Sequence, residues 1–214
     1  MSGAWPTIES AIDWSVPFVA WGTVLAAVVA AILPRALAGG SAAKGALAAA
    51  AAAVFIPVDG MPLGRWLHGI DGGLSIPLLA VLLDRAVEAW RARPLLDRPA
   101  RAAAGWFGLA CGLALYPAAL GLGGIDPYVL GWTSPVVMVA AAAVAAGLVW
   151  RGNRFGYVLL VAGLLWQLDV LESENAWDYL VDPIYFLLSP FGIAGSIRKP
   201  EPQAERGVDA SSLS

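Results

Sequence analysis

Charged residues are scarce in this 214-residue chain, because Asp, Glu, Lys and Arg together make up only 14% of it. Soluble globular proteins contain about 25%. Hydrophobic residues account for 59% of the sequence, and the mean hydropathy is +0.70. These values exclude an ordinary soluble domain. Because each helix that crosses a bilayer needs roughly 20 residues, the chain has room for about six or seven of them.

Cysteine and histidine are nearly absent, which excludes several kinds of chemistry. Cys111 is the single cysteine and lies in an apolar run, so neither an intrachain disulfide nor a thiolate metal cluster can form. His68 is the single histidine, which excludes bis-histidine haem and three-histidine zinc, and the position of Cys111 in an apolar run argues against Cys-His catalysis. The Gly-x-Ser-x-Gly and Gly-x-x-x-x-Gly-Lys-Ser motifs are missing. We therefore predict no metal and no cofactor, and we assign no catalytic residue.

The charges that do occur are sorted along the chain. Twelve of the thirteen Lys and Arg residues fall in alternate gaps between apolar segments, and ten of the sixteen Asp and Glu residues fall in the other gaps. The positive-inside rule assigns the basic gaps to the cytoplasm. This pattern predicts an all-α polytopic membrane protein, a compact bundle of six to seven transmembrane helices with its N-terminus outside and its C-terminus in the cytoplasm.

The composition also indicates the kind of organism and the kinds of partner to expect. Arg greatly outnumbers Lys and Ala is abundant, which indicates a GC-rich bacterial genome, so we expect a multi-pass protein of the bacterial inner (cytoplasmic) membrane. A net charge of −3 argues against nucleic acid, which needs clustered basic residues. The expected partners are membrane lipids and a membrane protein partner or a second copy of the chain.

Three regions are predicted: an outer interfacial segment over 1–15, a transmembrane bundle over 16–197 and a disordered cytoplasmic tail over 198–214. Ser15 is expected to cap the first helix, with Pro17 in its first turn. Later apolar segments cover 45–58, 74–90, 102–122, 134–150, 155–171 and 183–196. The first and last of these are short, which leaves six or seven crossings open, and a short outer interfacial or re-entrant helix is expected around Trp66.

Small residues at a spacing of four predict two sites of helix packing. Ala104, Gly108 and Gly112 share one face of the segment over 102–122, and Ala143 and Gly147 form a similar step in the next segment. Small side chains at this spacing allow two helices in a membrane to approach closely.

Ionisable residues near the outer end of the sixth segment form the first candidate binding site. Asp169 and Glu172 would lie one helical turn apart beside Trp166, with Asp178 a little further along the chain. An ionisable group within a membrane is costly unless it faces a cavity or a partner, so such groups are functional candidates. The alternative is that the helix ends early and Asp169 lies in water.

A second group of candidates comes from the first outer loop. His68 lies near Arg65 and Asp71, a trio that could bind phosphate or transfer a proton. Three tryptophans on the outer side, Trp66, Trp166 and Trp177, would suit a sugar or lipid headgroup if they gather beside the carboxylates. The alternative is an aromatic belt that anchors the bundle at the interface.

Three functions remain open. The simplest is a non-enzymatic accessory or partner subunit of an envelope or transport assembly. The second is a small transporter or binding component for a cation or polar solute, with Asp169 and Glu172 at its site. The third is an integral enzyme that acts on a lipid or lipid-linked glycan at the outer face, with one of these carboxylates as general acid or base.

Overall fold

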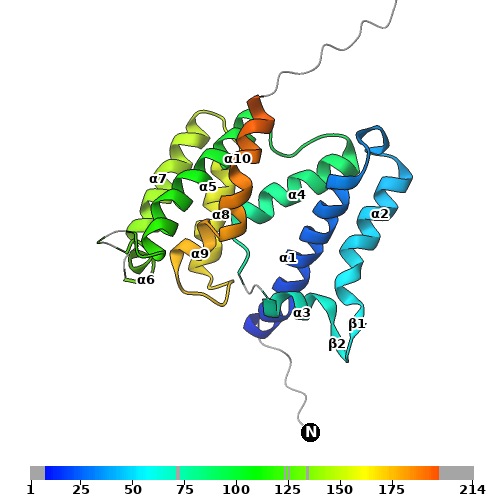
Figure 1. The fold of residues 1–214 in the computed structure, drawn as a ribbon, viewed down its shortest axis with the longest axis horizontal. Helices are drawn as coiled ribbons and strands as arrows, with labels where there is room; N and C mark the ends of the chain where they lie inside the picture. Colours follow the sequence, from blue (N-terminus) through cyan, green and yellow to red (C-terminus); the bar gives the residue numbers. More distant parts are fainter. Residues whose placement is uncertain (1–7, 71–72, 123, 125, 134, 198–214) are drawn as a thin grey trace, which may run out of the picture.

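The computed structural model describes residues 8–70, 73–122, 124, 126–133 and 135–197, and most of them are helical (Figure 1). The predicted all-α fold is confirmed, with the addition of one small hairpin. Its strands, β1 (Pro57–Val58) and β2 (Met61–Pro62), pair antiparallel. The turn between them is Asp59-Gly60, and both residues have positive φ, 47° and 80°. Asp-Gly favours this two-residue turn because Gly adopts positive φ without steric cost and Asp tolerates it.

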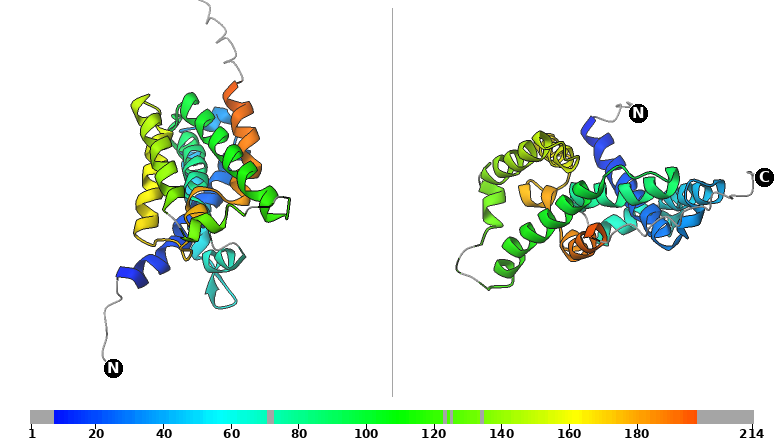
Figure 2. Two further views of the ribbon diagram at one scale, coloured as in Figure 1. Left: turned by 90° about the vertical axis from the view of Figure 1, so that its left-hand side faces the viewer. Right: turned by 90° about the horizontal axis from the view of Figure 1, so that it is seen from above.

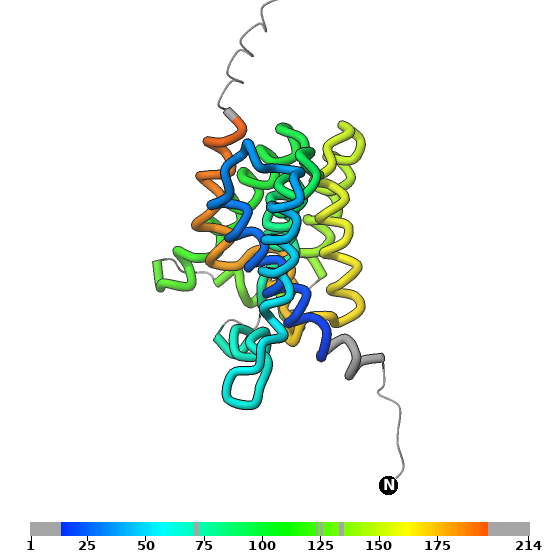
Figure 3. Tube along the Cα trace, turned by 90° about the vertical axis from the view of Figure 1, so that its right-hand side faces the viewer, coloured from blue at the N-terminus to red at the C-terminus, as the bar shows by residue number. Residues whose placement is uncertain are grey.

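The longer helices run back and forth between two ends of the molecule (Figures 1 and 3). They are α1 (Ile8–Ile32), α2 (Ser41–Ala52), α4 (Ile76–Arg91), α5 (Arg98–Ala119), α7 (Val136–Trp150), α8 (Phe155–Gln167) and α10 (Pro183–Ile197). Shorter pieces join them: the 3-10 turns η1 (Arg35–Leu37) and η2 (Ala53–Phe55), and the helices α3 (Leu63–Ile70), α6 (Val129–Thr133) and α9 (Ala176–Leu180). The predicted helix around Trp66 is α3.

We call one end of the bundle the arginine end, because it holds the basic connections over 33–40, 92–97 and 151–154. Hydrogen bonds tie these connections together. The amide of Gly39 donates to the carbonyl of Ala89 at 2.8 Å, and Arg154 donates through Nη1 to the carbonyl of Leu95 at 2.9 Å. The three basic gaps of the sequence therefore form one surface.

The opposite end, which we call the acidic end, holds α3, α6, α9 and the described residues of the connections between α5 and α7 and between α8 and α10. The amide of Ser75, which precedes α4, donates to Oδ2 of Asp182 at 2.9 Å, and the amide of Tyr185 donates to Oδ1 of the same carboxylate at 2.7 Å. Asp182 therefore caps the last helix, as an Asp directly before Pro favours, and the same carboxylate holds the start of α4.

Seen along the bundle, α7 and α8 form one edge, while α1 and α2 lie on the other side of α4 and α5 (Figure 2). The main core lies between α5, α7, α8 and α9. Phe155 is fully buried there with its ring edge-on to Phe107 at a centroid distance of 5.7 Å. Tyr179 is also fully buried, and its hydroxyl accepts a hydrogen bond from the amide of Leu171 at 2.9 Å.

The closest helix pair in the bundle is α5 with α10. Ala104, Gly108 and Gly112 are buried, and the hydroxyl of Tyr185 on α10 donates to the carbonyl of Ala104 at 2.6 Å. A Cβ atom on Gly112 would lie 2.9 Å from Cβ of Phe186. The structure thus places this face of small residues against the last helix, because only glycine leaves room for the side chains of α10.

The other step of small residues faces away from the rest of the chain. Ala143 and Gly147 are exposed, and a Cβ on Gly147 would meet nothing within 4 Å. Within the chain α7 instead packs against α8 through Ala145, which is fully buried, and Gly156, whose added Cβ would lie 2.7 Å from the carbonyl oxygen of Ala145. Ala143 and Gly147 therefore make no helix contact within the described chain, because the buried face of α7 is displaced from them around the helix, and their predicted role in helix packing stays a prediction.

The start of the first helix also differs from the prediction. α1 begins at Ile8 and passes through Ser15 and Pro17, so Ser15 is not its N-cap. The rings of Trp14 and Phe18, one helical turn apart, stack at a centroid distance of 6.3 Å. This contact agrees with a helix that continues through Ser15, because residues four apart are neighbours on the surface of a helix. The predicted tail over 198–214 lies outside the described residues.

Two helices of the described residues are long and apolar enough to cross a membrane: residues 14–32 of α1 and all of α5. Shorter apolar helices cover 41–55, 136–150 and 155–167. At 1.5 Å per residue, the 13 residues of α8 extend over about 20 Å, less than a hydrocarbon core of about 30 Å. By length and composition, the described residues therefore support fewer spans than the six to seven predicted from the sequence.

Candidate functional site

The end of α8 decides the geometry of the predicted carboxylate pair. α8 ends at Gln167, and Asp169 follows with a positive φ of 47°. The amide of Val170 donates to the carbonyl of Leu165, the pattern of a helix that closes through a left-handed residue. Asp169 is exposed and does not lie one helical turn from Glu172, so the two carboxylates do not pair on one helix, and the structure agrees with the alternative in which the helix ends early. Asp can adopt the left-handed conformation that is usually taken by Gly, so the sequence lacks the glycine that commonly marks the end of a helix.

His68 and Glu172 are brought together from distant parts of the chain. Nε2 of His68 lies 3.4 Å from Oε1 of Glu172, with the side chains 16% and 76% exposed. Arg65 does not join them, because its guanidinium lies over the ring of Trp14, 5.2 Å from the centroid. The predicted trio is therefore not assembled around His68, and Asp71 lies outside the described residues. An ion pair with one partner this exposed contributes little energy.

The three outer tryptophans each fix a connection instead of forming one aromatic wall. The indole N–H of Trp66 donates to the carbonyl of Val58 at 2.9 Å, and that of Trp166 donates to the carbonyl of Glu174 at 3.1 Å. Trp177 donates in the same way to the carbonyl of Pro127 at 2.9 Å. These bonds hold the hairpin, the connection after α8, and the approach to α6 in fixed positions.

Asp178 is the best-connected carboxylate of the predicted outer group. The hydroxyl of Tyr128 donates to both of its oxygens, at 3.0 and 3.1 Å, and the hydroxyl of Ser173 donates to Oδ2. Asn175, fully buried, supports this arrangement because its Nδ2 donates to the carbonyl of Tyr128 at 3.2 Å. Burial and the neighbouring Asp178 raise the pKa of Tyr128 to about 12. The phenol therefore stays a donor to Asp178 at neutral pH.

Asp178 also lines a cavity of about 650 Å³ at the acidic end, between α5, α9 and the start of α10. Tyr128, Ser173, Glu172 and Asp182 share this lining. The cavity offers oxygen atoms to a cation or to a hydroxyl-rich solute. In the described part of the chain, however, no three His, Cys, Asp or Glu side chains gather closely enough to hold a metal ion.

The arginine end contains a second site, which sequence reasoning missed. Asp84 on α4 is 1% exposed, and its Oδ1 accepts the amides of Leu95 and Leu96 at 2.7 and 2.8 Å. Its Oδ2 accepts Nε of Arg101 at 2.7 Å. Asp84 thus has three donors, two of which fold the connection from α4 to α5 back over the helix end. A buried carboxylate requires such partners because desolvating the charge is costly.

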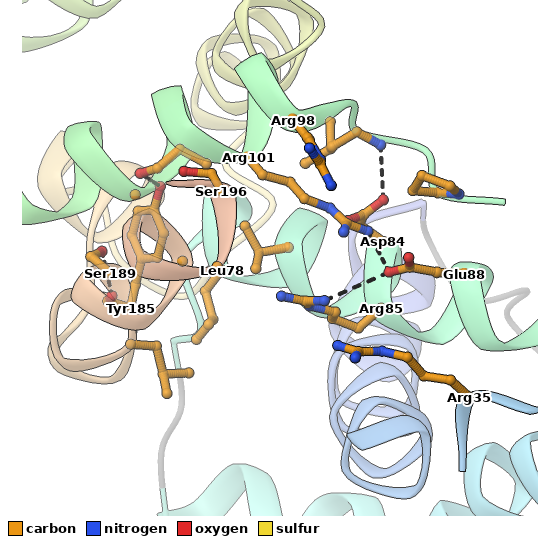
Figure 4. A pocket seen from close by; sticks show the side chains of 18 residues that line it. Arg35, Leu78, Asp84, Arg85, Glu88, Arg98, Arg101, Tyr185, Ser189 and Ser196 are labelled. Atoms are coloured by element: carbon orange, nitrogen blue, oxygen red, sulfur yellow. Dashed lines mark hydrogen bonds and ion pairs between the residues drawn. The ribbon is translucent and has the colours of Figure 1, made fainter. Parts of the chain in front are cut away.

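Arg101 joins this carboxylate to a second one. Its Nη2 donates to Oε2 of Glu88 at 2.6 Å, and Glu88 also lies 3.6 Å from Nη1 of Arg85, as the spacing of three predicts. Figure 4 shows these groups together with the guanidinium groups of Arg98 and Arg35. The sequence contains one sign of this network, because an Asp in an apolar helix requires a partner. It does not identify that partner, which lies 17 residues away on another helix.

These side chains line a cavity of about 700 Å³ between η1, α4, α5 and α10, which we call the arginine-end pocket (Figure 4). One side is charged, with Arg35, Arg85, Arg98 and Arg101 around Asp84 and Glu88. The opposite side is built from α10, with Tyr185, Leu188 and Gly192 among its residues. The pocket therefore combines a cationic region with an uncharged side, which also includes Ser189 and Ser196.

Comparison of the chain with protein-family models, with curated proteins and with solved structures found no match.

Proposed function

We propose that this chain is an integral protein of the bacterial inner membrane, with six to seven spans, its acidic end outside and its arginine end in the cytoplasm. The alternating direction of the long helices supports this topology, because every described basic connection lies at one end (Figure 3). Arg65 is the exception, since it lies on α3 at the acidic end. The positive-inside rule assigns the arginine end to the cytoplasm.

The sides of the bundle support the membrane setting. Large apolar residues are exposed along them, among others Val28, Val139, Leu164, Leu187 and Phe191, each more than half exposed. A soluble monomer rarely exposes a continuous apolar surface of this kind. Two exposed tryptophans, Trp90 and Trp150, lie in the last turns of α4 and α7 at the arginine end. Interfacial Trp and Arg side chains help helices as short as α7 and α8 to fit a bilayer, which can thin locally around them.

Within this membrane we propose a non-enzymatic role as an accessory or partner subunit of an envelope or transport assembly. The observation that carries it is the outer face of α7, a helix at the edge of the bundle (Figure 2). Ala143 and Gly147 are exposed there beside Val139 and Val144. Small residues at a spacing of four allow close approach of another helix in a membrane. A partner helix would occupy this face, supplied by another membrane protein.

The test replaces these two small residues by leucine. The Ala143→Leu/Gly147→Leu variant should fold, since a Cβ on Gly147 meets nothing within 4 Å, and should lose its companion when purified from native membranes. Ala142 and Ala146 are exposed at the same spacing on the same helix, so Ala142→Leu/Ala146→Leu is the matched control and should keep the companion. Equal retention of all companions by both variants would refute the partner role.

A second candidate function has one observation in its favour. The cavity at the acidic end is lined by Asp178, Glu172 and Asp182, which suits a small transporter or binding component for a cation or polar solute. On this proposal the site lies around Asp178 and not around Asp169. Calorimetric titration of Ca²⁺ into the purified chain tests it: binding that is lost in Asp178→Asn and retained in the exposed control Glu174→Gln supports this function, and its absence counts against it.

A further inference from the structure

The arginine-end pocket carries more positive charge than its carboxylates balance. Four arginines line it, Arg35, Arg85, Arg98 and Arg101, against Asp84 and Glu88, which leaves a formal excess of two positive charges. Arg101 is 19% exposed and engages both carboxylates. Asp84 already accepts three hydrogen bonds, and Glu88 is shared between Arg101 and Arg85.

Two of the four guanidinium groups are available to a ligand. Among the residues that the structure describes, neither Arg35 nor Arg98 has a carboxylate within 4.0 Å of its guanidinium. Both are exposed at the mouth of the pocket, and they come from different elements, η1 and the first residue of α5 (Figure 4). In Figure 4 the two guanidinium groups lie on opposite sides of the carboxylates and of Arg85, so an anion in the pocket would meet positive charge from more than one side.

The chemistry of arginine selects the kind of anion. A guanidinium presents a planar fork of N–H donors that fits two oxygens of a phosphate at once, and such bonds are roughly twice as strong as neutral ones. The pocket, at about 700 Å³, is far larger than a single phosphate group needs. Its uncharged side, which includes Leu188 and Ser189 of α10, would lie beside the remainder of a larger phosphate-bearing ligand.

We infer that the arginine-end pocket binds a phosphate-bearing anion, with Arg35 and Arg98 as the residues that contact the phosphate. Arg85 adds charge from α4, and Arg101 is a positioning residue, because its two bonds to Asp84 and Glu88 fix the shape of the charged side. The phosphate belongs either to the headgroup of an anionic lipid or to a soluble phosphate compound. The lipid source rests on the membrane topology proposed above, since basic pockets between cytoplasmic helix ends are where anionic headgroups lie.

The test uses the full chain, purified in detergent and in nanodiscs, with two probes. Native mass spectrometry measures retention of phosphatidylglycerol against zwitterionic phosphatidylcholine, and a thermal unfolding assay measures stabilisation by inorganic pyrophosphate. The variant Arg35→Gln/Arg98→Gln removes the two ligand contacts. Arg91→Gln/Arg93→Gln removes the same charge from exposed positions of the same end that do not line the pocket, and is the matched control.

Wild type and control should bind one of the two probes, and Arg35→Gln/Arg98→Gln should bind it about tenfold more weakly or worse, since each charged hydrogen bond contributes on the order of one tenfold step. Preference for phosphatidylglycerol identifies a lipid source, and stabilisation by pyrophosphate alone identifies a soluble one. Equal loss in both double variants, or no binding of either probe, would overturn the inference. The topology is tested separately by labelling, so a pocket that fails to bind in a correctly inserted chain refutes this inference alone.

Discussion

The close pairing of α5 with α10 makes a sharp prediction at Gly112. In Gly112→Ala the added Cβ would lie 2.9 Å from Cβ of Phe186 and closer still to its ring. Cβ is bonded to the backbone of α10, so Phe186 cannot relieve the contact by rotating its ring, and the helices must move apart. Adding a methyl group to a well-packed interface in this way costs about 1–3 kcal/mol.

The gain from helix propensity offsets part of this cost, because Ala is favoured over Gly in a helix by up to about 1 kcal/mol. The net prediction for Gly112→Ala is a loss of about 1–2 kcal/mol in the free energy of unfolding. Gly147→Ala has no such contact, since nothing lies within 4 Å of its added Cβ. Gly147→Ala should raise the free energy of unfolding by up to about 1 kcal/mol. The same Gly-to-Ala change is therefore expected to destabilise the protein in α5 and to stabilise it in α7.

The assay is thermal unfolding of each purified variant, followed by the fluorescence of the ten tryptophans. The midpoint for Gly112→Ala should fall below that of wild type, and the midpoint for Gly147→Ala should equal or exceed it. A Gly112→Ala protein as stable as Gly147→Ala would refute the claim that α5 and α10 touch at this glycine.

Three further predictions concern the polar groups. Asp84→Asn should lower the free energy of unfolding by about 3 kcal/mol in the same assay, because the buried side chain would turn an N–H donor towards another N–H donor and leave the charge of Arg101 without its carboxylate. A loss no larger than that of Glu88→Gln would contradict this. Glu172→Gln should change stability by less than about 1 kcal/mol, because its pair with His68 is exposed, and a larger loss would show that the pair is structural. Tyr128 should ionise near pH 12, above its usual value of about 10, so its stabilising bond is fully present below pH 10 and is lost as the pH rises through about 12. The difference in tyrosinate absorbance between wild type and Tyr128→Phe measures this, and a transition near pH 10 would be inconsistent with the bond to Asp178.

Local patterns in the sequence correspond to part of the local structure. The predicted short helix around Trp66, the cap at Asp182-Pro183 and the pair of Arg85 with Glu88 all depend on residues within a few positions of one another, whereas the predicted cap at Ser15 did not form. These features follow from capping preferences and helix geometry, which a single sequence displays directly.

Long-range contacts could not be read in the same way. Gly112 faces Phe186, and Asp84 meets Arg101, only because α5 lies against α10 and beside α4. A stripe of small residues shows that a helix can be approached closely but does not identify the helix that approaches it. The same limit explains Ala143 and Gly147, which have the right spacing and face away from the rest of the chain.

The sequence left the end of α8 open for a different reason. Hydropathy continues past Gln167 through Leu168, Val170 and Leu171, so the apolar run gives no sign of a helix end. The left-handed residue that closes the helix is Asp169, where glycine would have been the recognisable signal. The predicted pair of Asp169 and Glu172 depended on a continuous helix. In the structure the carboxylate with the most hydrogen bonds in this group is instead Asp178, which accepts from two hydroxyl groups.

The proposed function depends most on the membrane topology, which cysteine labelling tests directly. In a Cys111→Ala background, single cysteines replace Asp169 at the acidic end, Arg151 at the arginine end, and Ser212 near the C-terminus. In intact spheroplasts a membrane-impermeant maleimide should label position 169 only, and positions 151 and 212 should be labelled after permeabilisation. Labelling of positions 151 and 169 from the same side would contradict the proposed topology.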